Sequence, residues 1–493
     1  MTGSTRGGRN RGRQVTWWVG AALVLCATGW AARTLGPHIP IYWANLRFRM
    51  AVDALDVGAL GGRVLIVAPH PDDETLGPGG LIQQAIARGA EVYVVVMTNG
   101  DAYQYERAVM VVQDIVRGSA AEHRRVGRSR QQETLKALAG FGVPPDHVTF
   151  LGYPDTGVHF LWQPPYWSLD HPYRSPNTRT DHNPYEDSLS PGQAYSGAAV
   201  LHDLQRVIGR LQPTALLTTA PLDVHPDHWA TYGFVRAAVE CALQRNSHPM
   251  PVYAFLIHRH DWPAPQGYDP RRPLVPPAAW KTIGGVRWWR LELTPEQVET
   301  KRRSLALYRS QNAARSTELQ SLVRRNELFA VLDDYRDPSW PVAIADPVAD
   351  LPPDRVRPAE DIRAVELAQE GDSYRLTLRL AGRADRKLRY AILWHSLGPQ
   401  TARASSVVWT RGLAYLLECD ERGDVGRQRI ESQVAANSLS VHVSAQSLTG
   451  PGILLEAYSQ RGRRYIDHTM TVLIREKRDG GDLRQSPILG ALP

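Results

Sequence analysis

Short runs of apolar and β-branched residues mark the first part of the chain, among them residues 64–68 and 214–220. Runs of this length and composition suit strands that are buried on both faces of a parallel sheet. Helical patterns of apolar and polar residues follow at 129–138 and 229–245. Strands that alternate with helices predict an α/β domain with a mostly parallel sheet, which we place at residues 60–335.

The pattern changes in the second part of the chain. Residues 336–360 are rich in proline and predict a linker. Apolar and polar residues then alternate in several runs, for example 374–380 and 468–474, which is typical of strands with one buried face. We therefore expect an all-β, sandwich-like accessory domain at residues 361–477, followed by a flexible tail at 478–493.

Three polar residues of the kinds that bind metals follow the first apolar run. His70, Asp72 and Asp73 stand just after residues 64–68, and a glycine-rich turn at 77–80 then leads into a helix. His70 and Asp73 could coordinate one cation and leave Asp72 free. Imidazole and carboxylate together suit zinc or another divalent first-row ion. The alternative is a turn at the end of a strand with a capping aspartate and no metal.

A second polar cluster follows residues 214–220. It contains Asp223, His225 and His228, and a helical pattern begins directly after it. If the two strands lie parallel in one sheet, the two clusters converge, because ligands of open α/β sheets bind at the carboxyl edge of the strands. The two His-Pro-Asp turns therefore predict one shared metal site.

These turns resemble the motifs of a known family, the PIG-L/LmbE-like zinc N-deacetylases, which remove acetyl groups from N-acetylglucosaminyl compounds. The specific matches are residues 68–74 and 225–228, and the resemblance covers roughly residues 60–330. Supporting matches lie at residues 98–101, 130–133, 151–155 and 301–311.

The resemblance implies a metal-dependent enzyme that hydrolyses an amide bond. It makes His70, Asp73 and His228 the ligands of zinc or another divalent first-row ion. Asp72 would be the general base that takes a proton from the attacking water. His225, if protonated, would donate a hydrogen bond to the oxyanion of the tetrahedral intermediate.

Two further residues are candidates for substrate binding. Arg130 lies on the amphipathic helical pattern at 129–138, where a solvated charge is the alternative. Asp155 follows a strand-like run at 148–151, where it could equally form a turn.

A long loop at 153–197 is rich in aromatic residues and proline. We interpret it as a lid over the metal site, because loops of this length in compact domains are often binding loops. Trp162, Tyr166 and Trp167 would then stack on sugar rings. The alternative is a structural aromatic cluster beneath a long loop.

The N-terminal part predicts a separate unit. Residues 1–14 carry several arginines and precede an apolar stretch at 15–35 that has tryptophans near both ends. This pattern indicates a basic cytoplasmic tail and a single-pass membrane anchor, with the catalytic domain on the extracytoplasmic side. The alternative is a cleaved signal peptide, which would release a secreted protein.

Composition narrows the function classes. A chain of 493 residues with 43% hydrophobic and 22% charged residues is typical of a folded protein with more than one domain. The net charge of +7 is spread along the sequence without a nucleic-acid motif, so we expect no nucleic-acid partner. Three distant cysteines cannot form a disulfide framework.

These features predict a Rossmann-like catalytic domain with an all-β accessory domain and an N-terminal transmembrane segment. The predicted enzyme is a zinc-dependent hydrolase that removes the N-acetyl group from an amino sugar in a glycan, glycolipid or glycoconjugate. Two alternatives remain: an amide hydrolase of the same fold that acts on another acyl group or amine, and a catalytically silent glycan-binding membrane protein. A metallo-β-lactamase-type hydrolase is disfavoured because its His-x-His-x-Asp-His cluster is absent. The oligomeric state is left open.

Overall fold

The structure, a computed structural model, describes residues 52–102, 118–245, 248–259, 262–277, 280, 284–336, 341–346, 357–419, 424–462 and 464–475. The chain separates into two units, residues 1–53 and 54–493. The predicted basic tail, the membrane anchor and the C-terminal tail lie outside the described residues. Within the described ranges, no helix is both long enough and apolar enough to cross a membrane.

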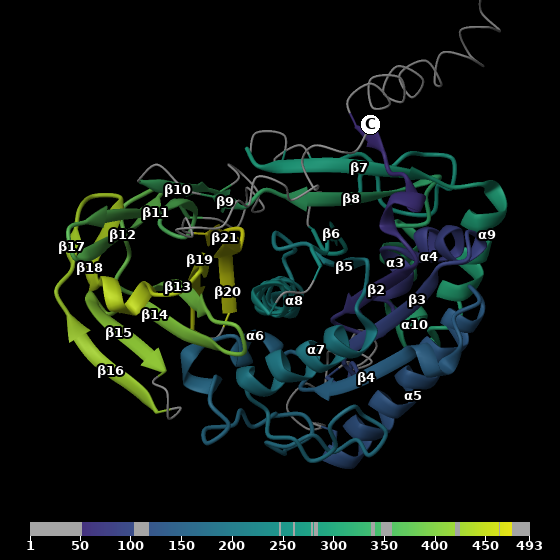
Figure 1. Ribbon diagram of the computed structural model, residues 1–493, viewed down its shortest axis with the longest axis horizontal. Coiled ribbons are helices and arrows are strands. Elements are labelled where there is room, and N and C mark those ends of the chain that lie inside the picture. The colour runs from purple at the N-terminus through teal and green to yellow at the C-terminus, as the bar shows by residue number, and fades with distance from the viewer. Residues whose placement is uncertain are drawn as a thin grey trace, which may run out of the picture. The chain divides into compact units, whose positions relative to one another are not determined.

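A mixed sheet forms the centre of the predicted catalytic domain at residues 60–335, the catalytic part (Figure 1). Its strands run in the order β7-β8-β6-β5-β2-β3-β4, and β2 to β6 are parallel, whereas β8 is antiparallel to both of its neighbours. The strands are β2 (Arg63–Ala68), β3 (Glu91–Thr98), β4 (Val148–Tyr153), β5 (Ala215–Thr219), β6 (Val252–Phe255), β7 (Val286–Glu292) and β8 (Asn326–Leu332). A two-residue strand, β1 (Asp53–Ala54), precedes them. The prediction of a mostly parallel sheet is confirmed.

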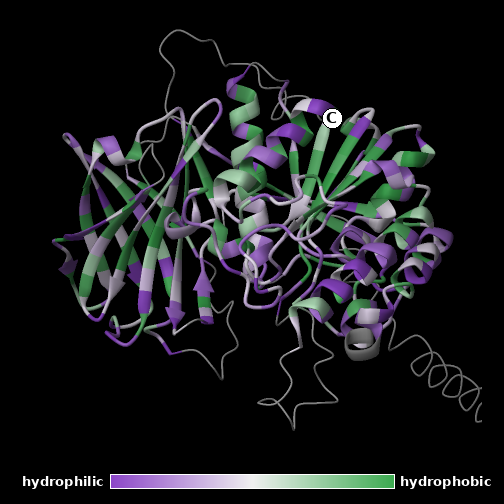
Figure 2. Ribbon diagram, turned by 90° about the horizontal axis from the view of Figure 1, so that it is seen from below, coloured by the Kyte–Doolittle hydropathy of each residue, from purple (hydrophilic) through white to green (hydrophobic). Residues whose placement is uncertain are grey.

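Helices cover both faces of this sheet (Figures 1 and 2). The helices are α3 (Asp73–Leu76), α4 (Gly79–Ala87), α5 (Ala120–Ala139), α6 (Val158–Leu161), α7 (Gly197–Leu211), α8 (Pro226–Gln244), α9 (Pro295–Leu305) and α10 (Arg309–Gln320). In Figure 2 the strands are predominantly apolar, as expected for a sheet that is buried on both faces. Helix α8 is buried around almost its whole circumference, which requires a second packing partner on the side away from the sheet.

That partner is the all-β region, which consists of two mainly antiparallel sheets. One sheet has the order β10-β11-β12-β18-β17, and the other has the order β16-β15-β14-β13-β19-β21-β9, with β20 paired to β19. The strands are β9 (Tyr335–Arg336), β10 (Val342–Ala345), β11 (Ile362–Glu370), β12 (Ser373–Leu380), β13 (Arg389–Leu397), β14 (Ala402–Thr410), β15 (Leu413–Cys419), β16 (Val425–Ile430), β17 (Gln433–Val434), β18 (Ser438–Ser444), β19 (Gly452–Arg461), β20 (Arg464–His468) and β21 (Val472–Arg475). The expected all-β region is therefore present.

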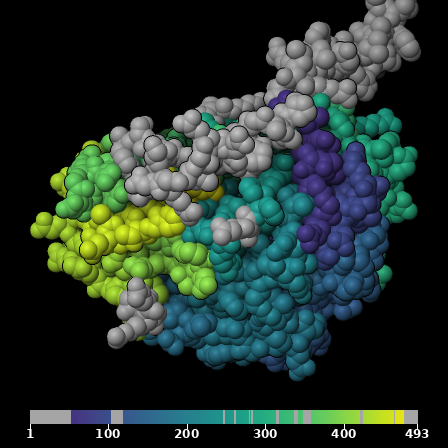
Figure 3. Space-filling view, viewed as in Figure 1, coloured from purple at the N-terminus to yellow at the C-terminus, as the bar shows by residue number. Residues whose placement is uncertain are grey.

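The β region shares one hydrophobic core with the catalytic part. Trp162 and Trp229 lie in the same buried cluster as Leu393 of β13 and Leu454 of β19. Strands β13 and β19 are buried along almost their whole length, because one face packs on the other sheet and the other face on α8 and Trp162. In Figure 3 the green and yellow atoms of the β region adjoin the teal atoms of the catalytic part.

Two expected boundaries differ in the structure. Residues 336–360 are not only a linker: β9 pairs with β21, and β10 pairs with β11, so the β region begins near Tyr335. These pairings override the proline-rich composition, because short strands at a sheet edge tolerate neighbouring prolines.

The interpretation of Trp162 and Trp167 as sugar-stacking residues is wrong. Trp162 is fully buried, and its indole N–H donates to Glu456 in β19 at 3.0 Å. Trp167 is also buried, and its indole N–H donates to the carbonyl of Ala402 at 2.8 Å. Both rings anchor the loop to the β region, in agreement with the alternative of a structural aromatic cluster.

The contact between the two parts should weaken in acid. His395 stacks on Trp162 with ring centroids 3.6 Å apart, and its Nε2 donates to the Trp162 carbonyl at 3.0 Å. Burial lowers the pKa of His395 to about 3, so the folded protein keeps this ring neutral while an unfolded chain protonates it near its ordinary pKa of about 6.5. The folded state therefore binds fewer protons between these two values, and the free energy of unfolding falls as the pH drops below about 6.5.

Between pH 7 and pH 5, the free energy of unfolding of the wild type should fall by about 2 kcal/mol more than that of His395→Gln. The measurement is urea unfolding of both proteins at the two pH values. Equal losses in both proteins would contradict the prediction.

Candidate metal centre

The two ligand clusters meet where the strand order of the sheet reverses. The chain proceeds from β2 to β3 and β4 on one side, then returns to place β5 on the other side of β2. His70 and Asp73 follow β2, and His225 and His228 follow β5. Open α/β sheets bind their ligands at this point, because the loops after the two central strands diverge and leave a crevice there.

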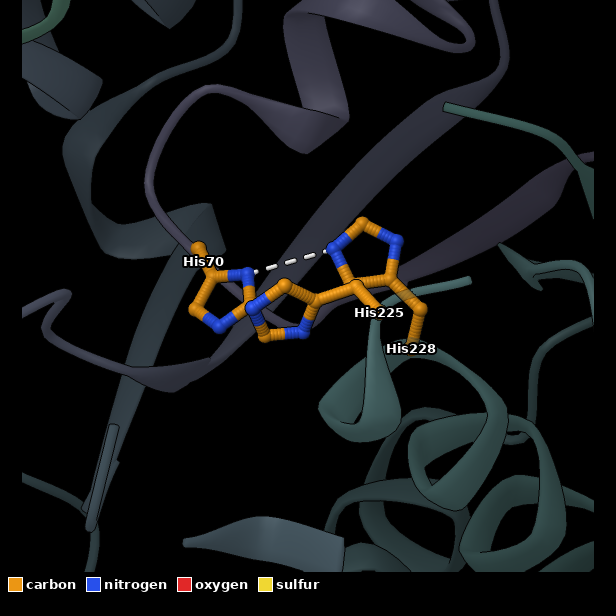
Figure 4. A group of neighbouring side chains, drawn as sticks. All are labelled: His70, His225 and His228. Atoms are coloured by element: carbon orange, nitrogen blue, oxygen red, sulfur yellow. Dashed lines mark hydrogen bonds between the residues drawn. The ribbon is translucent and has the colours of Figure 1, made fainter. Parts of the chain in front are cut away.

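Three donor atoms of these residues converge, and the dashed line in Figure 4 joins two of them, on His70 and His228. His70 Nδ1 lies 3.3 Å from Asp73 Oδ2 and 3.2 Å from His228 Nε2, and His228 Nε2 lies 3.2 Å from Asp73 Oδ2. A tetrahedral ion with bonds of about 2.0 Å holds its donors about 3.3 Å apart. The three predicted ligands thus fit one face of a zinc-type coordination sphere.

The outer nitrogen of His228 is held by a carboxylate. Its Nδ1 lies 3.0 Å from Asp223 Oδ2, which also accepts from the backbone N–H groups of Ile257 and His258. Burial alone lowers the pKa of His228, but Asp223 and Asp73 raise it to about 9. A partner of this kind fixes the ring orientation and increases the basicity of Nε2, the His228 nitrogen in the three-donor set.

The His70 nitrogen that lies outside the three-donor set, Nε2, faces two carboxylates. It lies 3.3 Å from Asp155 Oδ1 and 3.5 Å from Asp227 Oδ2, although neither contact has hydrogen-bond geometry. Asp227 is held in turn by His159, whose backbone N–H and Nδ1 lie 3.2 and 2.9 Å from Asp227 Oδ1. All four residues are buried, so their charges act on one another in a poorly hydrated environment.

Asp72 adopts a strained backbone conformation next to this centre. Its φ of 117° is rare for a residue with a side chain and costs on the order of 1–3 kcal/mol. Glu74 accepts a hydrogen bond from the Asp72 backbone N–H at 3.1 Å, and Tyr308 donates to the other oxygen of Glu74. The turn is therefore supported by buried polar contacts, and it leaves the Asp72 carboxylate outside the three-donor set.

The surroundings of His225 favour a neutral ring. Burial lowers its pKa well below the ordinary value, and the nearby His70 and His228 lower it further. Its Nδ1 accepts from the backbone N–H of Asp227 at 3.2 Å, which a protonated ring could not do. His225 is thus neutral, with its proton on Nε2, and it can still donate one hydrogen bond from that atom.

The substrate-binding candidates have different surroundings. Arg130 is buried, and it donates to the carbonyls of Pro71 at 2.7 Å and Gly100 at 3.0 Å, so it stabilises the ligand turn. Asp155 accepts from the backbone N–H of Ala102 at 2.8 Å in addition to facing His70. Contact of Arg130 or Asp155 with substrate stays a prediction.

Of the three residues predicted to stack on sugar rings, only Tyr166 is partly exposed. It packs edge-on against Phe160 and Tyr173, with ring centroids 6.3 and 5.2 Å away. Phe160 adjoins His159, with ring centroids 4.1 Å apart, so this cluster lies near the metal centre.

Sequence reasoning missed several supporting residues. Asp227 stands inside the second motif, where the repeated His-Pro-Asp pattern could have identified it. Asp223 belongs to the predicted polar cluster, but the sequence assigned it no supporting role. His159 carries no local signal, because only the folded chain brings it to the site. Tyr308 lies in the supporting match at 301–311, which assigned it no role. His258 also lies within ligand range of Asp73 and His228.

Comparisons with known proteins agree with the site. The family model described as GlcNAc-PI de-N-acetylase, PIG-L, matches residues 65–239. A 1D-myo-inositol 2-acetamido-2-deoxy-alpha-D-glucopyranoside deacetylase of Mycobacterium sp. (strain KMS) is 32% identical over 197 residues, which cover 39% of this chain and 55% of the relative. The corresponding protein of Kribbella flavida is 30% identical over 190 residues, which cover 37% of this chain and 55% of that protein. The chain thus spans about half the length of these relatives.

Solved deacetylase structures show weaker similarity. The A40926 pseudoaglycone deacetylase Dbv21 is 19% identical, with a TM-score of 0.35, over 55% of this chain and 97% of that chain. The N,N'-diacetylchitobiose deacetylase from Pyrococcus horikoshii is 18% identical, with a TM-score of 0.32, over 51% of this chain and 70% of that chain. The family match includes both ligand turns and ends within α8. Residues 65–239 of this chain are a PIG-L domain.

Proposed function

We propose that this protein is a metal-dependent N-deacetylase of an N-acetylated amino sugar in a glycan, glycolipid or glycoconjugate. The observation that carries the proposal is the convergence of His70 Nδ1, Asp73 Oδ2 and His228 Nε2 at 3.2 to 3.3 Å. The deacetylase names of the curated relatives support the reaction.

The residues have separate tasks in this proposal. Zinc bound by the three donors would lower the pKa of a water molecule and polarise the amide carbonyl. Asp72 takes a proton from the water and delivers it to the departing amine. His225, neutral with its proton on Nε2, donates to the developing oxyanion. The products are acetate and a free amino sugar.

The aromatic cluster formed by Phe160, Tyr166 and Tyr173 offers a surface for the sugar. Its rings are half-buried and near the metal centre, and ring faces suit the C–H faces of pyranoses. We expect Tyr166→Ala to lower kcat/KM for an acetylated oligosaccharide by about 10-fold and to affect an N-acetyl monosaccharide less. Equal losses on both substrates would contradict the stacking role.

A substrate screen tests the reaction itself. Metal-loaded protein is incubated with N-acetylglucosaminyl inositol, chitooligosaccharides and N-acetylglucosaminyl glycolipids, and both released acetate and free amine are measured. Acetate from at least one substrate, absent with Asp72→Asn, is expected. Release of another acyl group, or acetate only from non-sugar amides, would favour the related amide hydrolase. Binding of glycans without any acyl release would instead favour the catalytically silent glycan-binding protein.

We also propose that the N-terminal segment anchors the enzyme in the cell membrane, with the catalytic part on the extracytoplasmic side. The apolar stretch at 15–35 and the preceding arginines motivate this proposal. The full chain should remain with membranes after extraction with high salt and alkaline carbonate, whereas a chain that begins at residue 52 should not. A mature protein that begins after residue 32 would show a cleaved signal peptide instead.

A further inference from the structure

The β region reaches the support of the metal centre through α6, the short helix that carries His159. The carboxyl end of this helix is held at Trp162, whose indole N–H donates to Glu456 and whose carbonyl accepts from His395. Glu456 belongs to β19 and His395 belongs to β13. Two strands of the β region therefore fix one end of α6.

Strand β20 provides a second contact on the same helix. Tyr465 packs edge-on against the ring of His159, with centroids 5.1 Å apart and planes at 88°. The Tyr465 hydroxyl also accepts a hydrogen bond from Gln163, which lies just beyond α6. His468 stacks on Trp229, the residue that follows the ligand His228, at 4.2 Å and 12°. Figure 1 shows β20 between β19 and α8.

These contacts continue to a metal ligand. Tyr465 touches His159, His159 Nδ1 lies 2.9 Å from Asp227 Oδ1, and Asp227 Oδ2 lies 3.5 Å from His70 Nε2. Each member except Tyr465 is more than nine-tenths buried, so a displaced ring has little room to move without displacing its neighbour. The matched PIG-L segment ends at residue 239, and Tyr465 lies far outside it.

We propose that the β region is part of the metal centre, and that Tyr465 is a positioning residue for it. The Tyr465 ring keeps His159 oriented towards Asp227, and Asp227 sets the charge on the outer side of His70. Mutation of residues that support the metal ligands typically changes metal affinity by about 10- to 100-fold. The β region therefore adjusts the zinc affinity of the site. This inference rests on the proposed metal site, and it gives the β region a task in metal binding.

The test measures zinc affinity directly in the full chain, by competition with a chromophoric chelator. Tyr465→Leu should weaken zinc binding by about 10-fold, while Tyr465→Phe, which keeps the ring, should stay within about 2-fold of the wild type. Tyr390→Leu is the matched control, because Tyr390 is also a buried tyrosine of the β region and its hydroxyl donates to Ala359 rather than to the catalytic part. This control should lose thermal stability and keep its zinc affinity.

Excess zinc separates positioning from general destabilisation. It should restore acetate release by Tyr465→Leu to within about 3-fold of the wild type, since only metal occupancy has been lowered. Unchanged zinc affinity in folded Tyr465→Leu, or an equal loss in Tyr390→Leu, would overturn the inference. If Tyr465→Leu does not fold, His468→Leu tests the same strand through Trp229, with an expected loss of about 3- to 10-fold and the same overturning result. Zinc binding without acetate release from any substrate would refute the proposed function alone.

Discussion

Replacing Asp72 by asparagine is expected to lower kcat by about 100-fold or more and to leave zinc bound. The amide has the shape of the carboxylate but cannot take a proton from water. Asparagine also tolerates a positive φ better than most residues, so the strained turn at Asp72 should persist. The measurements are zinc content by elemental analysis and the rate of acetate release under saturating substrate.

A second aspartate serves as the control for this change. Asp203 is equally buried, but it accepts from the hydroxyls of Tyr153 and Ser190 and belongs to α7 rather than to the ligand turns. Asp203→Asn should cost stability and keep kcat within a few-fold of the wild type. If Asp72→Asn also stays within a few-fold, proton transfer belongs to another residue.

Removing His228 should abolish both metal binding and activity. The wild-type chain is expected to hold about one zinc ion, and His228→Ala leaves only two of the three donors, which should lower zinc affinity by at least about 100-fold. Asp223→Asn should have an intermediate effect of about 10-fold, because Asp223 only orients the His228 ring. Zinc affinity and acetate release are measured for each protein after chelation and stepwise return of zinc.

The matched control is a histidine that lies away from the site. His147 stacks on Tyr93 and its Nδ1 contacts the Val92 carbonyl, so His147→Ala should keep full zinc content. Full zinc occupancy in a folded His228→Ala protein would remove His228 from the ligand set. Activity that survives complete chelation would argue against a metal-dependent reaction as a whole.

The sequence-based predictions agree best with the structure for residues that lie close together in the chain. His70 and Asp73 are three residues apart on one turn, and His225 and His228 are three apart on another, so each pair is placed by its own short segment. The remaining step was the pairing of β2 with β5, which follows from the parallel arrangement of strands at the centre of such sheets. Sequence patterns can therefore predict both the donor set and its position.

The burial of the tryptophans in the aromatic loop could not be predicted from the sequence. Tryptophans in a proline-rich loop suit either a sugar surface or a buried anchor, because the same ring offers apolar area for both. Trp162 and Trp167 are buried between α8 and the strands β13, β14 and β19, and these strands are more than 200 residues away along the chain. No local pattern records such a contact.

By itself, the sequence determined the α/β and all-β character of the two parts, which depends on residue periodicity, and its short motifs, through the family resemblance, predicted the three metal donors and the base. Only the tertiary structure decided the neutral state of His225, the support from Asp227 and His159, and the shared core between the catalytic part and the β region. These features depend on burial and on contacts between distant segments. Desolvation and close packing arise only when the chain folds, so short sequence patterns do not predict them.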